Sequence, residues 1–129
     1  MDYEMKKIGY NYPSNEVLNE TYKTIMSYIK GVGNMFAMSE RCRQYFTWGA
    51  HAFKYICSDD GCYGIQFSVS GMLHRGRVRI YYNVGTDYFD VELLRARKDE
   101  LVWGCSDLDF EQLHNVLHQH IERTDDVEV

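Results

Sequence analysis

The sequence predicts a single α+β domain in which an N-terminal and a C-terminal helix pack on one face of an antiparallel sheet of about four to six strands. Three observations predict this fold: an apolar stripe at helical spacing near each end of the chain, strict alternation of apolar and polar residues between the two stripes, and a composition typical of a folded domain. The chain has 129 residues, of which 45% are hydrophobic and 15% aromatic. It can therefore bury one core without disulfides or metals, and it is too apolar for a disordered chain. We divide it into an N-terminal arm (1–12), one domain (13–122) and an acidic tail (123–129).

The first helix is expected to begin just after Pro13. Ser14 or Asn15 can cap it, and Glu16 suits its first turn. Gly31 and Gly33 predict its end. We interpret its apolar stripe as core rather than as a binding surface. The stripe consists of Leu18, Tyr22, Ile25, Met26, Ile29 and Val32.

Residues 34–57 carry a mixed signal. Residues 35–38 resemble a short buried strand, and residues 44–48 and 53–56 are rich in β-forming side chains with imperfect alternation. A helix capped by Ser39 and ending at Phe46 is the alternative.

Three runs of alternating apolar and polar residues, in 65–70, 77–82 and 88–93, predict half-buried antiparallel strands. Gly71 and Gly76 bracket one turn, and residues 83–86 form the next. Pairing Tyr82 with Asp87 places apolar residues against apolar ones and arginines against carboxylates, so we expect this register. The opposed pairs are then Ile80–Phe89, Val78–Val91, Tyr81–Tyr88, Arg79–Asp90 and Arg77–Glu92.

A last strand is expected at residues 101–103, and residues 106–109 resemble a capping box for the C-terminal helix. Five residues at helical spacing form the apolar side of that helix: Phe110, Leu113, Val116, Leu117 and Ile121.

The four cysteines are too few for a disulfide scaffold. Cys57 and Cys62 flank a predicted turn and leave three alternatives open: buried thiols in a reducing compartment, a bridge across a hairpin, or part of a metal site. The first seven residues lack the apolar region of a secretory signal, and no window approaches ~18 uninterrupted apolar residues. We therefore expect a cytoplasmic protein with no membrane span.

Charge is unevenly distributed along the chain, whose net charge is −5. Residues 106–129 hold seven acidic residues against Arg123 alone, so the rest of the chain is nearly neutral, with a mildly basic stretch at 74–98. This distribution excludes a histone-like nucleic-acid coat but permits a local anionic contact.

The C-terminal helix could hold a divalent metal through Glu111, His114, His118 and Glu122, which share one helical side. The alternative is a solvated face whose histidines are supported by carboxylates. The sequence contains no nucleophile elbow, phosphate-binding loop or dinucleotide fingerprint. We therefore favour a non-enzymatic protein, with no catalytic residue and no cofactor predicted.

The outward sheet face offers Arg77, Arg79, Tyr81 and Tyr88, side chains that can neutralise phosphates and stack on bases. Two carboxylates on the neighbouring strand oppose the arginines, which favours a salt-bridged solvated face instead. The adjacent turn carries Met72 and Leu73, followed by His74 and Arg75. An exposed apolar pair at a turn tip suits a contact with another protein.

The stretch from Gly33 to Ser39 has the pattern G-N-x-F-x-M-[ST] after an amphipathic helix, and residues 88–92 look like a Y-x-V-E strand. Over roughly residues 25–95 the chain resembles small phage and mobile-element proteins of no established activity. Residues 40–44 depart from the Thr-Gly-Ala-Lys-Asn run of that family. The resemblance implies an accessory protein of a mobile element and brings no catalytic residues with it.

The sequence thus predicts a non-enzymatic interaction module that binds another protein. The alternatives are a single-stranded nucleic-acid binder using the Tyr/Arg sheet face and a metal-dependent enzyme using His114 and His118.

Overall fold

A computed structural model describes residues 3–31 and 39–122. The expectations for Val32, Gly33, residues 35–38, the family-like stretch up to residue 38 and the acidic tail lie outside the described residues. The elements, in chain order, are α1 (Asn15–Ile29), α2 (Glu40–Thr47), β1 (His51–Cys57), β2 (Tyr63–Ser70), β3 (Arg75–Asn83), β4 (Tyr88–Leu94), β5 (Leu101–Leu108) and α3 (Phe110–Ile121).

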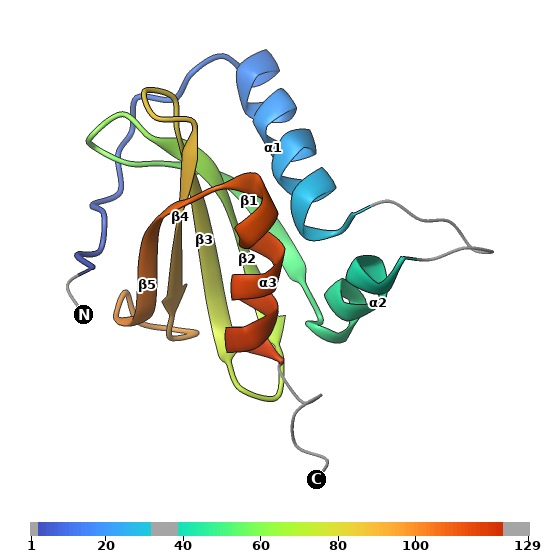
Figure 1. Ribbon diagram of the computed structural model, residues 1–129. Coiled ribbons are helices and arrows are strands. Elements are labelled where there is room, and N and C mark those ends of the chain that lie inside the picture. The colour runs from blue at the N-terminus through green and yellow to red at the C-terminus, as the bar shows by residue number, and fades with distance from the viewer. Residues whose placement is uncertain (1–2, 32–38, 123–129) are drawn as a thin grey trace, which may run out of the picture.

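The five strands form one antiparallel sheet in the order β1-β2-β3-β4-β5, so each strand pairs with its neighbours in the sequence. The helices cover one face of this sheet, with α1 and α3 side by side and α2 beside them (Figure 1). The predicted α+β class is confirmed, together with its N-terminal and C-terminal helices.

The predicted start of α1 is confirmed. The Ser14 hydroxyl accepts a hydrogen bond from the Val17 amide at 3.2 Å, which satisfies one of the free amides of the first turn. The helix ends at Ile29, and Gly31 follows in the left-handed region at φ +75°.

Residues 44–48 are not a strand, because α2 covers most of them. The Ser39 hydroxyl caps this helix by accepting from the Cys42 amide at 3.1 Å. Cys42 and Tyr45, three residues apart, face the core, and the fully buried Trp48 ends the helix. The helical alternative is therefore correct, because the cap and this spacing outweigh the β-forming composition.

The core lies between the helices and the inner face of the sheet. It is built from the apolar residues that alternate along β2, β3 and β4 and from the stripes of the helices. Its buried members are Ile25, Ile29, Tyr45, Trp48, Ile65, Phe67, Val69, Val78, Ile80, Phe89, Val91, Leu93, Leu108, Leu113, Leu117 and Ile121.

The predicted register between β3 and β4 is wrong by two residues. Tyr82 pairs with Phe89, and Ile80 with Val91. The turn occupies residues 84–87, because the Asp87 amide donates to the Asn83 carbonyl at 2.8 Å with Asp87 at φ +64°. A shift of two keeps every side chain on its predicted face, so the core is unchanged. On the other face the opposed pairs become Arg79–Glu92, Tyr81–Asp90 and Arg77–Leu94.

The last strand is longer than predicted, and α3 begins later. β5 continues to Leu108, so residues 106–108 belong to the strand. Asp109 is the N-cap, and it forms a reciprocal capping box with Gln112. The predicted capping box starts three residues too early, because Ser106 and Asp109 are both good N-cap residues.

Cys57 and Cys62 are not bridged, and Cys42 and Cys105 are also free thiols. Across the hairpin Cys57 pairs with Tyr63 rather than with Cys62. Within the described ranges, no helix is both long enough and apolar enough to cross a membrane.

Candidate functional site

The turn between β2 and β3, residues 71–74, is fastened to the end of α3; we call it the distal turn. The Leu73 and His74 amides donate to the Ile121 carbonyl at 2.9 and 3.3 Å, and the Met72 amide donates to a Glu122 carboxylate oxygen at 2.9 Å. A Cβ atom on Gly71 would lie 2.2 Å from the same carbonyl, so only glycine allows this approach. The turn therefore has a fixed conformation.

This anchoring holds two apolar side chains in solvent. Met72 is 72% exposed and Leu73 is 59% exposed. His74 is instead buried; its Nε2 lies 3.3 Å from the Arg77 carbonyl, and burial lowers its pKa. Of the four predicted contact residues, His74 thus supports the turn, whereas Arg75 is exposed beside the apolar pair.

A groove of about 520 Å³ adjoins the distal turn; we call it the basic groove. Arg77 shapes its wall by donating to the Arg95 carbonyl at 3.1 Å and to the Lys98 carbonyl at 2.7 Å, which fastens the β4–β5 turn. Arg95 forms an ion pair with Glu100 at 2.8 Å. The residues that line the basic groove are Leu73, His74, Arg75, Arg95, Ala96, Arg97, Lys98 and Val102.

The basic groove carries unpaired positive charge. Arg75, Arg97 and Lys98 are exposed and form no ion pair within residues 3–31 and 39–122. The sequence indicated this surface only through the basic balance of residues 74–98. It missed Arg97 and Lys98 as site residues, because their position beside the distal turn depends on the fold of two separate hairpins.

The Tyr/Arg face proposed for nucleic acid is not an open surface. Arg79 is 4% exposed; its Nε donates to Gln66 at 2.9 Å, and its Nη2 lies 3.3 Å from Asp99. Tyr81 is fully buried, whereas Tyr88 is exposed at the far end of the next strand. The expectation of a solvated face is wrong here, because Gln66 and Asp99 contact Arg79 and the N-terminal arm places Lys6 over the ring of Tyr81.

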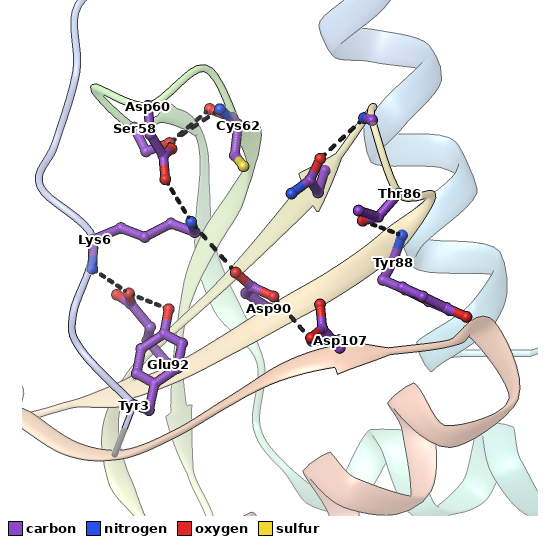
Figure 2. Close-up of polar contacts among 12 residues, drawn as sticks. Tyr3, Lys6, Ser58, Asp60, Cys62, Thr86, Tyr88, Asp90, Glu92 and Asp107 are labelled. Carbon is purple, nitrogen blue, oxygen red and sulfur yellow. Dashed lines mark hydrogen bonds and ion pairs between the residues drawn. The ribbon is translucent and has the colours of Figure 1, made fainter.

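The N-terminal arm, residues 3–12, runs along the side of the sheet opposite the helices (Figure 1). Figure 2 shows how its side chains reach the sheet: the Tyr3 hydroxyl and the Lys6 amide both donate to Glu92 Oε2, at 2.7 and 2.8 Å. Lys6 Nζ lies 2.8 Å from Asp60 and 3.3 Å from Asp90. The arm therefore closes a network of charges over β4.

The charges in this network perturb one another. The hydrogen bond from Lys6 lowers the pKa of Asp60 to about 2. Burial raises the pKa of Glu92, against the opposing effect of its two hydrogen bonds. Within the described ranges, Glu92 Oε1 and the Tyr81 hydroxyl have no hydrogen-bond partner. Glu92 is fully buried, so we interpret this network as a structural contact that holds the arm on the sheet rather than as a binding site.

The predicted metal residues of α3 do not converge. His114 is buried, with Nδ1 2.6 Å from the Ile29 carbonyl and Nε2 2.8 Å from the Gln44 side chain. His118 Nδ1 accepts from the indole of Trp48 at 3.0 Å. Glu122 accepts from the distal turn, and Glu111 lies exposed in the first turn of the helix. No group of three potential metal ligands occurs in the described part of the chain.

No family model, no curated protein and no solved structure matches this chain.

Proposed function

We propose that the protein is a non-enzymatic interaction module that binds an acidic segment of another protein through Met72, Leu73 and the basic groove. The observation that carries the proposal is the exposed apolar pair on an anchored turn, placed beside a groove with four cationic side chains. Apolar side chains supply affinity when they are covered, and complementary charges steer and orient a partner.

The chemistry of the groove favours a protein over a nucleic acid. Single-stranded nucleic acids are held by aromatic side chains that stack on bases. Among the residues that the structure describes, no Phe, Tyr or Trp lines the basic groove. Arg79 and Tyr81, which the nucleic-acid alternative requires, are buried. A partner encoded by a host or by a mobile element fits the family resemblance of residues 33–39.

Affinity capture from lysate with matched variants tests this proposal. We expect the parent protein to retain a stoichiometric partner, and the double variant Met72→Ser/Leu73→Ser to bind it at least about tenfold more weakly. Val84→Ser is the control, because Val84 is also exposed but lies at the opposite end of β3. Retention of the partner by the double variant, or no stoichiometric partner for the parent, contradicts the proposal.

A charge-based measurement separates the two macromolecular classes. Arg97→Ala/Lys98→Ala removes two cations of the groove that form no ion pair in the described structure. We expect this variant to bind the captured protein with a lower association rate and a weaker salt dependence. The nucleic-acid alternative would be favoured instead if the parent shifts a single-stranded oligonucleotide in a gel at low salt and this variant does not.

A further inference from the structure

A second concavity, of about 480 Å³, lies at the end of the sheet opposite the distal turn. One wall is a face of α1 that extends from Glu16 to Tyr28, and the other is formed by the adjacent ends of β2, β3 and β4 with the start of α3. We call it the aromatic cleft. Five aromatic rings line it: Tyr28, Tyr63, Tyr82, Phe89 and Phe110.

These rings form one continuous series of contacts. Tyr28 lies between Phe110 and Phe89, with ring centroids 5.3 and 5.9 Å away. Tyr82 continues the series, 5.4 Å from Phe89 and 6.2 Å from Tyr63. Phe110 is 51% exposed, so the series reaches from the core to solvent. Mutual packing fixes the orientation of these rings before any ligand enters.

The charged side chains of the cleft are all acidic. Glu16 and Glu20 come from α1, and Asp87 from the β3–β4 turn. Within residues 3–31 and 39–122, no Lys, Arg or His lines the cleft and these three carboxylates form no ion pair. Their negative charge is therefore available to a ligand.

Asp87 is held in place by the aromatic wall. The Tyr82 hydroxyl donates to its carboxylate at 2.6 Å, and this hydrogen bond raises the pKa of Tyr82 to about 12. The hydroxyl thus stays protonated near neutral pH and keeps donating. This hydrogen bond comes from a neutral group, so it places no positive charge beside the Asp87 carboxylate.

This combination selects one class of ligand. Ring faces carry negative electrostatic potential and attract cations, more strongly where the cation has lost part of its hydration. Carboxylates at the rim add to that attraction and repel anions. A bare metal ion is a poor match, because the described residues bring no three metal-binding groups together. A cation with an alkyl body matches both the rings and the carboxylates.

We propose that the aromatic cleft binds an organic cation of the alkylammonium class, with its alkyl groups against the rings and its charge near Asp87 and Glu20. A volume of about 480 Å³ is within the usual range for small-ligand sites. The cation can be a free alkylammonium ion or the ammonium group of a lysine side chain in a peptide, since both carry a positive charge on an alkyl body.

Titration of the full chain with choline, followed by amide NMR shifts and calorimetry, tests the site. Neohexyl alcohol is the matched control ligand, because it has the same shape as choline without the charge. We expect saturable shifts at the residues of the cleft with choline, and at least several-fold weaker binding of the alcohol. Methylated and unmethylated lysine peptides form a second arm, which identifies whether a free or a peptide-borne cation binds more tightly.

Two substitutions test the contributions of charge and ring separately. Asp87→Asn removes the charge, and asparagine tolerates the left-handed backbone at this position. Phe110→Leu removes an exposed ring and keeps an apolar side chain. Each should weaken choline binding about two- to fivefold. The controls Asp59→Asn and Phe46→Leu, exposed residues outside the cleft, should bind as the parent does.

Equal affinity for choline and neohexyl alcohol overturns the proposal. The proposal is also overturned if neither choline nor either peptide binds saturably. It is overturned as well if both cleft variants, with NMR spectra that show an intact fold, bind choline as tightly as the parent does. The cleft and the distal turn lie at opposite ends of the sheet, so these results do not depend on those for the basic groove.

Discussion

The buried imidazole of His114 makes the stability of the protein sensitive to acid. Its side chain is 1% exposed, and burial lowers its pKa from the ordinary 6.5 to about 4. The ring is therefore neutral near neutral pH, so one nitrogen donates and the other accepts. The single N–H of the neutral ring lies on Nδ1, which donates to the Ile29 carbonyl at 2.6 Å, and Nε2 lies 2.8 Å from Gln44 Oε1.

The lowered pKa fixes both the sign and the size of the effect. Below about pH 6.5 the unfolded chain takes up a proton on His114, while the folded chain does not until the pH approaches about 4. The contribution of His114 to stability is therefore complete above this window and is lost as the pH falls through it. A shift of this size corresponds to about 3 kcal/mol of unfolding free energy.

Urea denaturation of the parent and of His114→Gln, across a pH series, measures this contribution. Glutamine does not titrate and keeps hydrogen-bonding capacity at the site. We expect the stability difference between the two proteins to decrease by about 3 kcal/mol from about pH 7 to about pH 4. Other groups with perturbed pKa values, such as Glu92 and His74, are present in both proteins and cancel. Parallel stability curves over this range would refute the reasoning.

Three further predictions concern the N-terminal arm and the thiols. Gly104→Ala should displace the arm and speed amide exchange there, because its Cβ would lie 2.3 Å from the Tyr3 ring; unchanged exchange would contradict this. Lys6→Met should lower the unfolding free energy by about 2 kcal/mol in urea denaturation, because Asp90 loses its cation in a site that is mostly shielded from water. A loss near zero would contradict this and would indicate that the Lys6–Asp90 pair is exposed. Cys105 is half-buried and the other three thiols are buried, so a thiol reagent should label about one cysteine per native chain, and Cys105→Ser should abolish that labelling.

Local signals predicted the helices well, because caps and apolar stripes act over a few residues. Ser14 and Ser39 cap helices through hydroxyls that accept from amides three residues ahead. The β composition of residues 44–48 misled the prediction, because aromatic side chains serve equally well on a buried helix face. Tyr45 and Trp48 are examples, both in the main core.

The alternation of the strands predicted the faces of the sheet but not its register. Sliding β3 against β4 by two residues preserves every face, so only the turn decides between the two pairings. That turn depends on the left-handed backbone of Asp87, a residue that adopts this conformation only occasionally. Charge pairing favoured the wrong register, because it assumed that Arg79 faces water.

The distal turn was predicted from the glycines that bracket it, Gly71 and Gly76, whereas the surfaces around the turn could not be predicted. Glu92, which pairs with Arg79 across the strands, is bound by the N-terminal arm through contacts that span 86 and 89 residues of sequence. The aromatic cleft likewise combines side chains from α1, three strands and α3. No pattern within a single segment indicates such combinations.

The route of the N-terminal arm has a consequence for the order of folding. Each strand of the sheet pairs with a sequence neighbour, so every hairpin can form by closing a short loop. The arm is different, because it touches the β1–β2 turn through Ile8 and reaches β5 where Tyr3 packs against Gly104. Its docking surface does not exist until the last strand is in place. We therefore expect residues 3–12 to be the last to gain protection during refolding, and the first to lose it in mild denaturant.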